Sequence, residues 1–328
     1  MDFDKLFSSF KDIKVAVIGD VMLDTYWWGK VDRISPEAPV PIVAVSKREE
    51  RIGGAGNVAL NVQALGASVS VISVIGKDAE ADQLNALLKS NHINTDHLIK
   101  SEERITTNKI RIIGRNQQMM RLDAEITNPL SKNDEQNLLS SFEDYIKKEG
   151  PSIVILEDYN KGVLTSTVIK KIISLCRANN ILTAVDPKRK NFFTYEHADI
   201  FKPNLHEAKE GLNIISDELT DDSLKKIHES LFEKLKHNIS LITLSEKGVF
   251  YQTGNEHQVI PTHIRSIADV SGAGDTVIAV ASVVYAATKD VHLMAEMANI
   301  AGGLVCEDVG TVAIDKSRLL EECKHLLN

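Results

Sequence analysis

Short, largely apolar runs that each fit one strand constrain the fold of this chain most. They cover residues 13–18, 69–75, 153–156, 181–185 and 239–244. Runs of this length and character are typical of strands that are buried on both faces of a parallel sheet. Segments with a helical pattern, such as residues 79–90, separate the runs. The alternation predicts a doubly wound, mostly parallel α/β sheet flanked by helices, with ligands bound where the strands end.

Composition limits the domain organisation and the classes of partner. The 328 residues exceed the ~250–300 residues at which a single core stops growing, so we expect one large domain with an appendage, or two domains. The net charge of −8 argues against broad nucleic-acid binding and provides no basic face for an anionic membrane. No apolar stretch approaches the ~18 residues of a membrane span. Three widely spaced cysteines and the lack of a signal-peptide pattern favour a cytoplasmic location.

One stretch near the C-terminal end, residues 269–276 with the sequence Asp-Val-Ser-Gly-Ala-Gly-Asp-Thr, lies directly before an apolar run at 277–287. The run predicts a buried helix, so the N–H groups of Gly272, Ala273 and Gly274 would lie at its positive N-terminal end. Asp275 in the first turn would then border a site for negative charge. Phosphoryl transfer needs both the amides and the acid, because the amides stabilise charge on the transferred group and the acid accepts the proton of the attacking hydroxyl. The alternative is that an aspartate merely caps the helix and the glycines make a turn.

Two further segments carry candidates for binding polar ligands. Asp20 and Asp24 follow the first predicted strand, and Gly53, Gly54 and Asn57 lie at the start of a predicted helix. Carboxylates at a strand end, and an amide beside glycines, can reach sugar hydroxyls. The alternative for the carboxylates is a turn and a solvated loop, and the glycine cluster alone is weak support. Its spacing matches neither a dinucleotide fingerprint nor a phosphate-binding loop of the Walker type.

The segment from Tyr26 to Val45 holds both tryptophans and three prolines, which exclude a helix and disfavour a central strand. We expect an extended lid sheet there, formed by about residues 22–52 and 104–122, with residues 41–45 as its clearest strand. Its exposed aromatic and aliphatic side chains would be covered by a second copy of the chain, or by the main domain. A cluster of cations, Lys109, Arg111, Arg115 and Arg121, is a candidate for binding a phosphate or a polyhydroxyl group. The alternative is a solvated strand whose charges keep its edge soluble.

Other strand ends offer polar residues that should meet at one edge of the sheet. Residues 157–162 include two acids and Lys161, and residues 186–188 repeat the pattern. Asn204 and Glu207 lie three residues apart at a helix start, where they can hold Mg²⁺ through its waters or form a capping box. The spacing alone favours the capping box. Residues 243–248, with Ser245 and Gly248, and the helix around Asn299 should lie beside a nucleotide.

Several of these motifs resemble those of the ribokinase-like (phosphofructokinase B) carbohydrate kinases. Residues 269–276 are similar to the second signature of that family, residues 53–59 to its first, and Asn204 to Glu207 to its N-x-x-E motif. The segments 19–24, 33–41 and 115–123 resemble the subgroup that phosphorylates heptose 7-phosphate. Glu157 departs from that subgroup, whose members tend to carry serine there. The nucleotidyltransferase domain often fused behind such kinases is not expected within this sequence.

The resemblance implies a single ribokinase-like domain over residues 1–328, ATP and Mg²⁺ as cofactors, and a homodimer formed through the lid sheet. The need for a monovalent cation stays open. The implied roles are a catalytic base (Asp275) with an anion cradle (Gly272, Ala273, Gly274), sugar contacts (Asp20, Asp24, Gly53, Gly54, Asn57), substrate-phosphate contacts (Arg111, Arg115, Lys161), Mg²⁺ contacts (Asn204, Glu207) and nucleotide contacts (Asn204, Glu207, Ser245, Gly248, Gly272, Gly274, Asn299). A kinase for another sugar phosphate or a nucleoside, and a non-catalytic nucleotide-binding module, are the alternatives.

Overall fold

The computed structural model describes residues 1–114, 117–216, 219–263 and 265–327. A nine-stranded main sheet runs through the body of the molecule. In spatial order its strands are β13 (Glu256–Ile260), β12 (Val249–Thr253), β11 (Ile239–Thr243), β10 (Ile200–Phe201), β9 (Leu182–Asp186), β8 (Ile153–Glu157), β1 (Lys14–Gly19), β4 (Ser68–Gly76) and β5 (Asn94–Ser101). The strands from β11 to β5 are parallel, whereas β12 and β13 extend one edge as an antiparallel hairpin. The predicted doubly wound sheet is confirmed.

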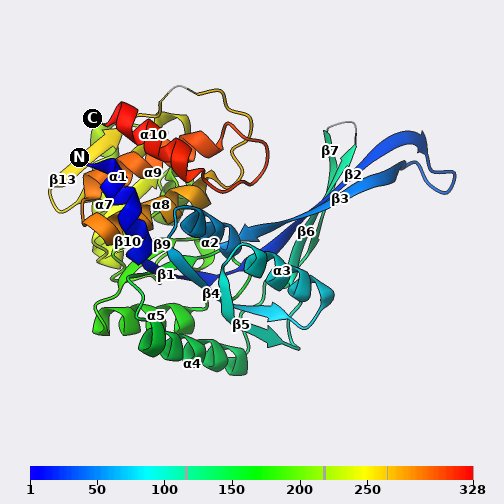
Figure 1. The fold of residues 1–328 in the computed structure, drawn as a ribbon, viewed down its shortest axis with the longest axis horizontal. Helices are drawn as coiled ribbons and strands as arrows, with labels where there is room; N and C mark the ends of the chain where they lie inside the picture. The colour runs from blue at the N-terminus through cyan, green and yellow to red at the C-terminus, as the bar shows by residue number, and fades with distance from the viewer. Residues whose placement is uncertain (115–116, 217–218, 264, 328) are drawn as a thin grey trace.

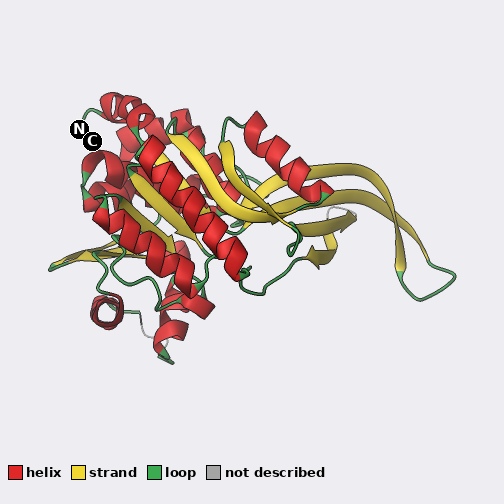
Figure 2. Cartoon of the chain, turned by 90° about the horizontal axis from the view of Figure 1, so that it is seen from below, coloured by secondary structure: helices red, strands yellow, loops and turns green. Residues whose placement is uncertain are grey.

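Helices cover both faces of the main sheet (Figures 1 and 2). One face packs against α1 (Phe3–Ser9), α2 (Ala55–Ala64), α3 (Ala79–Ser90), α8 (Ala273–Thr288), α9 (Val291–Val305) and α10 (Lys316–Leu326). The other packs against α4 (Lys132–Glu149), α5 (Ser166–Ala178), α6 (Leu205–Leu212) and α7 (Asp221–Leu235). Short 3-10 helices, η1 (Phe10–Asp12), η2 (Arg189–Asn191) and η3 (Ser245–Lys247), lie in connections. Alternate residues of β1 explain both cores: Val15 and Val17 face the first layer, Ala16 and Ile18 the second.

A second, four-stranded sheet projects from this body (Figure 1). Its order is β3 (Pro41–Gly54), β2 (Val21–Ile34), β6 (Thr107–Gly114) and β7 (Gln117–Ala124), with β2 and β6 parallel. The expected strand at residues 41–45 is therefore only the start of a fourteen-residue strand. Pro41 opens β3, an edge strand, where proline is tolerated because no ladder N–H is needed. Pro36 and Pro39 lie in the turn between β2 and β3.

The two faces of this second sheet differ in character. Strand register places charged side chains and one aromatic residue on one face: Asp24, Tyr26, Lys109, Arg111, Arg121 and Asp123. We call this the polar face. The opposite face carries Trp27, Ile110, Ile112, Met120 and Leu122, and we call it the apolar face. Met120 is 55% exposed and Leu122 is 43% exposed, so part of the apolar face is open to solvent.

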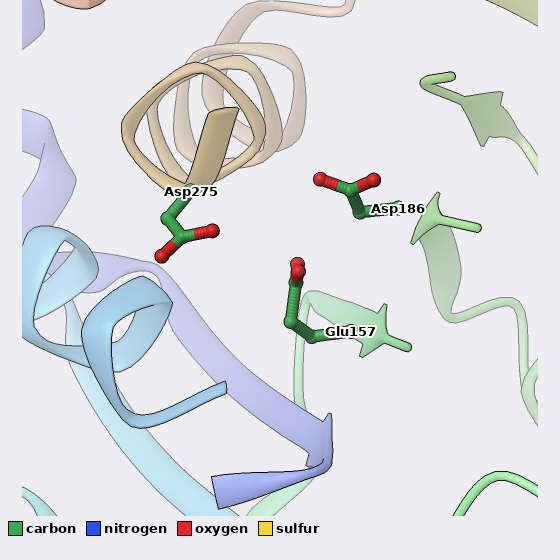
Figure 3. Close-up of side chains that lie close together, drawn as sticks. All are labelled: Glu157, Asp186 and Asp275. Atoms are coloured by element: carbon green, nitrogen blue, oxygen red, sulfur yellow. The ribbon is translucent and has the colours of Figure 1, made fainter. Parts of the chain in front are cut away.

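The carboxyl ends of the parallel strands bring the polar strand ends together. Gly19, Glu157 and Asp186 are neighbours across β1, β8 and β9. A Cβ at Gly19 would lie 1.9 Å from the carbonyl oxygen of Glu157, so only glycine fits this close approach. The N-terminus of α8 lies beside these strand ends, as Figure 3 shows for Asp275. Among the described helices, none is long and apolar enough to cross a bilayer.

Candidate active site

A cavity of about 760 Å³ opens at this edge of the main sheet. It is lined by nine of the predicted site residues, which come from separate parts of the sequence: Asn204, Glu207, Ser245, Gly248, Gly272, Ala273, Gly274, Asp275 and Asn299. Its walls combine apolar side chains, such as Val249 and Val277, with the charged side chains of Lys188 and Lys202. Asn299 is fixed by donating from Nδ2 to the carbonyl oxygen of Pro261 at 2.9 Å. The predicted nucleotide contacts therefore lie together around one hollow.

Asp275 is the third residue of α8, whose N-cap is Gly272 with a φ of 80°. Its carboxylate is 5% exposed and borders the cavity. Oδ2 accepts a hydrogen bond from Asn57 Nδ2 at 2.7 Å, and Oδ1 accepts one from the Tyr159 hydroxyl at 2.8 Å. Burial raises the pKa of Asp275 to about 6, against the two hydrogen bonds, which lower it. A Cβ at Gly272 would lie 2.9 Å from Asn57 Nδ2, so glycine also leaves room for that amide.

The N-terminal ends of α2 and α8 are tied together around this carboxylate. Asn57 is fully buried on α2, and Asn61, one turn later, donates from Nδ2 to the Asn57 carbonyl oxygen at 2.9 Å. Asn61 Oδ1 accepts from the Thr276 hydroxyl at 3.0 Å and from the Ile314 N–H at 2.9 Å. Helix α2, which the sequence predicts after Gly53 and Gly54, thus positions the amide that contacts Asp275.

Some of the charged side chains in the cavity wall form ion pairs with one another. Lys202, buried beside β10, lies 2.7 Å from Asp186 Oδ2, and Lys188 contacts Glu207 Oε1. Burial alone would lower the pKa of Lys188, but the carboxylates of Asp186 and Glu207 raise it. The motifs give no role to Lys202, Lys188 or Tyr159, although residues 157–162 and 186–188 are expected at this edge of the sheet. Their signal was present in the rule that strand ends carry ligand contacts, because residues 186–188 and 202 follow β9 and β10.

Asn204 and Glu207 form the capping box that their spacing allows. Asn204 Oδ1 accepts from the Glu207 N–H at 2.8 Å, and Glu207 Oε2 accepts from the Asn204 N–H at 2.9 Å. Since Glu207 Oε1 contacts Lys188 as well, both oxygens of Glu207 already have partners.

Glu157 is the most isolated carboxylate of the site. It is 1% exposed, and neither of its oxygens has a hydrogen-bond partner among the described residues. Figure 3 shows it between Asp186 and Asp275, and ligand oxygens of the three lie within 4.8 Å of one another. Burial, and then the negative charges of Asp186 and Asp275, raise the pKa of Glu157 well above its usual value.

The predicted sugar contacts are arranged differently from the nucleotide contacts. Asp20 is buried and accepts the N–H groups of Tyr159, Lys161 and Val163 at 2.9, 3.0 and 3.0 Å, so its carboxylate holds the loop after β8. Gly53 and Gly54 end β3, and Gly54 is the N-cap of α2 with a φ of 60°. None of these residues lines the 760 Å³ cavity.

The predicted phosphate-binding cations all contact carboxylates, as far as the described chain goes. Arg111 pairs with Asp24, and Lys161 Nζ lies 2.7 Å from Glu125 Oε1. Lys109 lies 3.2 Å from both Asp123 and Glu125. Arg121 Nε lies 2.8 Å from Asp123 Oδ1. Arg115, also predicted, lies outside the described residues.

Comparison with known proteins places the chain in a family. Residues 12–317 match the family described as pfkB family carbohydrate kinase. The bifunctional protein HldE of Aliarcobacter butzleri (strain RM4018) is 41% identical over 323 residues, which are 97% of this chain and 66% of the relative. The chain therefore spans about two thirds of the length of the curated relatives it matches.

Solved structures agree on the fold. Escherichia coli phosphofructokinase-2 in complex with potassium aligns with a TM-score of 0.81 at 16% identity, covering 96% of this chain and 100% of that chain. Arabidopsis thaliana ribokinase, complexed with ribose and ATP, aligns with a TM-score of 0.73 at 16% identity, covering 94% and 99%. The chain thus has the ribokinase-like fold and belongs to the pfkB family of carbohydrate kinases, enzymes that transfer a phosphoryl group to a sugar hydroxyl.

Proposed function

We propose that this chain transfers the γ-phosphoryl group of ATP to the C1 hydroxyl of D-glycero-β-D-manno-heptose 7-phosphate, giving the 1,7-bisphosphate for ADP-heptose and lipopolysaccharide core synthesis. One observation carries the kinase chemistry: Asp275 borders the cavity at the N-terminus of α8, beside the N–H groups of residues 272–274. The choice of sugar is supported by the relatives named HldE and by the subgroup resemblance of residues 33–41. Free, buried cysteines are compatible with a reducing cytoplasm as the location.

In this mechanism Asp275 accepts the proton of the attacking hydroxyl while the new O–P bond forms and ADP leaves. The amides of Gly272 and Gly274 would stabilise the charge that develops on the transferred group, and the helix dipole adds to their effect. The Ala273 N–H would join them by leaving the Val270 carbonyl oxygen, to which it donates at 3.3 Å. Asn57 and Tyr159 hold the carboxylate of Asp275 in place through both of its oxygens. A volume of about 760 Å³ lies within the usual range of ~300–1,000 Å³ for a small-molecule site, so a nucleotide fits.

Mg²⁺ is the metal that this chemistry implies, and the oxygen-rich wall of the cavity suits it. Its role when bound is to neutralise charge on the ATP phosphates. Asn204 and Glu207 would hold it through water, because their own oxygens already close the capping box and contact Lys188.

The polar face of the second sheet is proposed to hold the sugar phosphate. Arg111 on this face, and Lys161 in the loop after β8, carry the charge that a 7-phosphate requires. Arg111 now contacts Asp24, and Lys161 contacts Glu125. A bound phosphate would take over one partner of each pair, which frees Asp24 to accept a hydrogen bond from a sugar hydroxyl. Figure 1 shows the second sheet projecting beside the body, where it can act as a lid that excludes water.

We propose that a second copy of the chain covers the apolar face of the second sheet. Exposed Met120 and Leu122, with Ile110 and Ile112 in register, form an apolar surface of the kind that marks protein interfaces. A double change of Met120→Glu and Leu122→Glu should convert a dimer to a monomer in light scattering. A chain that is monomeric before the change would refute this arrangement.

The substrate is tested by a phosphoryl-transfer assay with ATP across heptose 7-phosphate, hexose phosphates, unphosphorylated sugars and nucleosides. We expect the largest kcat/KM with heptose 7-phosphate and a 1,7-bisphosphate product. A larger value with another sugar phosphate would keep the kinase and overturn the substrate. Nucleotide binding without transfer to any acceptor would favour the non-catalytic module instead.

A further inference from the structure

We propose that Glu157, Asp186 and Asp275 form a site for one divalent cation with a preference for oxygen ligands. The site takes its cation without nucleotide, and it is separate from Asn204 and Glu207. This proposal goes beyond phosphoryl transfer, because none of the proposed catalytic steps uses Glu157.

The fold directs the three carboxylates to one point. Glu157 and Asp186 are paired in register at the ends of β8 and β9, so their side chains leave the sheet on the same face. Ile155 on β8 and Ala184 on β9, two residues earlier, pack in the core that includes α8, so this face looks toward α8. Asp275 comes from the first turn of α8 and points back at the two strand ends (Figure 3). Three separate elements therefore supply one oxygen each.

The spacing suits an oxygen-liganded ion. Ligand oxygens of the three residues lie within 4.8 Å of one another. Opposite ligands of Mg²⁺, bound at ~2.1 Å, are about 4.2 Å apart, and those of Ca²⁺, at ~2.3–2.6 Å, are about 4.6–5.2 Å apart. Because the bound of 4.8 Å is close to these separations, small side-chain rotations bring the trio onto Mg²⁺, Mn²⁺ or Ca²⁺.

A second observation points to a ligand at the same place. Both oxygens of Glu157, which is 1% exposed, and Oδ1 of Asp186 lack hydrogen-bond partners among the described residues. A buried carboxylate without donors is costly, by several kcal/mol or more. A proton on Glu157 would serve one of its oxygens and leave the other without a donor, whereas a cation between the three side chains contacts all of them.

With Glu157 ionised, the local charges are also unbalanced without a cation. Four carboxylates, those of Glu157, Asp186, Glu207 and Asp275, face two ammonium groups, Lys188 and Lys202. Lys202 is engaged with Asp186 and Lys188 chiefly with Glu207. Within the described chain, no ion pair reaches Glu157 or Asp275, so one divalent charge would balance the group.

The test is a Mn²⁺ titration of the full 328-residue chain without nucleotide, followed by electron paramagnetic resonance of free Mn²⁺. We expect one site in the wild type, weakened at least tenfold by Glu157→Gln, and displaced by Mg²⁺ or Ca²⁺. Glu246→Gln, an exposed change in the same cavity wall, should leave binding unchanged. A wild type without a bound ion, or a Glu157→Gln variant that binds as well as the wild type, overturns the proposal.

Two more variants keep the test decisive. Glu207→Gln should still bind Mn²⁺, and loss of binding there with retention in Glu157→Gln would assign the ion to the capping-box residues instead. If Glu157→Gln does not fold by circular dichroism, Asp186→Asn takes its place with the same expected loss. Thermal unfolding supplies a second readout, since Mn²⁺ should raise the Tm of the wild type and not that of the variant. No ATP or sugar is involved, so the result is independent of whether the proposed kinase reaction is correct.

Discussion

The cavity at the edge of the main sheet and the polar face of the second sheet differ in how far they are prepared for a ligand. The cavity is a formed hollow of about 760 Å³ with an excess of carboxylates in its wall. On the polar face, Lys109, Arg111 and Arg121 each already contact a carboxylate. One region can receive a ligand as it stands, whereas the other must exchange partners first.

The difference follows from what fixes each region. The cavity residues are placed by strand register, by the start of α8 and by the cap of α6, all of which are set by the packed core. The polar-face pairs lie on a sheet that projects from the body, and Arg121 there is 48% exposed along its side chain. The exposed pair of Arg121 and Asp123 contributes only ~0–1 kcal/mol. The side chains of Arg111 and Asp24 are only 21% and 8% exposed, so a phosphate has to take the place of the carboxylate as the partner of that guanidinium. A rigid nucleotide subsite beside an exchangeable sugar-phosphate subsite is the arrangement we infer.

The largest effect is expected at Asp275, the proposed base at the edge of the cavity. Asp275→Asn should fold and bind ATP, because the amide keeps the shape of the side chain, but it should lose on the order of 10²–10⁴ in kcat as a general base is removed. Stopped-time assays with saturating ATP and sugar measure the loss, and nucleotide binding by calorimetry provides the control. A variant that turns over at the wild-type rate would remove Asp275 from the mechanism.

A change confined to the polar face should affect one substrate alone. Arg111→Gln removes the charge that pairs with Asp24, so we expect the KM for the phosphorylated sugar to rise about 10- to 100-fold, as for loss of a charged hydrogen bond. The KM for ATP should stay within about twofold, since no residue of that face lines the cavity. Initial rates with each substrate varied give both constants.

Arg121→Gln is the matched control for this prediction. Arg121 lies opposite Arg111 in register on β7, on the same face, but is more exposed and paired with Asp123 within its own strand. Its effect on either KM should be under about threefold. Equal effects of the two variants, or a parallel rise in the KM for ATP, would contradict the division into two subsites.

Much of the fold could be predicted from the sequence, because local patterns and core burial agree in the main body. The helix expected after residues 269–276 is α8, and the helix expected at residues 79–90 is α3. The second sheet was harder. Along β2 the residues change from buried to half-buried to exposed, and β3 returns from exposed to buried residues. Neither strand has the uniform pattern of a core strand, so residues 41–45 are the clearest strand in this part of the sequence. Pro36 and Pro39 mark the turn and Pro41 the start of β3, but the prolines do not indicate how long the strands are.

In the site, too, local motifs could be predicted from the sequence, and contacts between distant residues could not. Motifs predicted the residues that face the cavity, since glycine and acid at a helix start have a local signature. They did not predict pairing across the sequence, such as Arg111 with Asp24 or Lys161 with Glu125, because an ion pair depends on which strands become neighbours. Asp20 accepts hydrogen bonds from three backbone N–H groups of the loop after β8, and no local sequence pattern predicts this role. Tyr159 lies in that loop and donates to Asp275, and this contact had no local signature either.

Tyr159 tests whether the rigidity of the cavity contributes to turnover. Tyr159→Phe removes the hydroxyl that donates to Asp275 Oδ1 at 2.8 Å and keeps the ring, so we expect kcat to fall about tenfold with little change in either KM. In an Asp275→Asn background the same change should have almost no further effect, because both act through one group. Additive losses in the double variant would show that Tyr159 acts on something other than the base.

The smallest effect concerns neither region and sets the pH range in which both can be compared. His228 on α7 and His237 shortly after this helix are both buried, and both contact the hydroxyl of Ser240, at 2.9 and 2.6 Å. Burial lowers the pKa of His237 to about 3 and that of His228 to about 4. An unfolded histidine titrates near ~6.5, so below that pH the unfolded state binds more protons and folding stability falls as pH falls. His237 alone should lower the free energy of unfolding by roughly 1 kcal/mol for each unit that the pH falls between pH 6 and pH 4.

Urea unfolding followed from pH 7 to pH 5 measures this slope. The wild-type midpoint should fall with pH, and His237→Gln should flatten the fall because glutamine stays neutral throughout. An equally steep fall in the variant would place the acid sensitivity elsewhere, for example in His228, because the raised pKa of Asp275 changes stability with pH in the opposite direction. With a flattened slope, losses of activity below pH 6 in the wild type would have to be corrected for unfolding before they are assigned to either the cavity or the polar face.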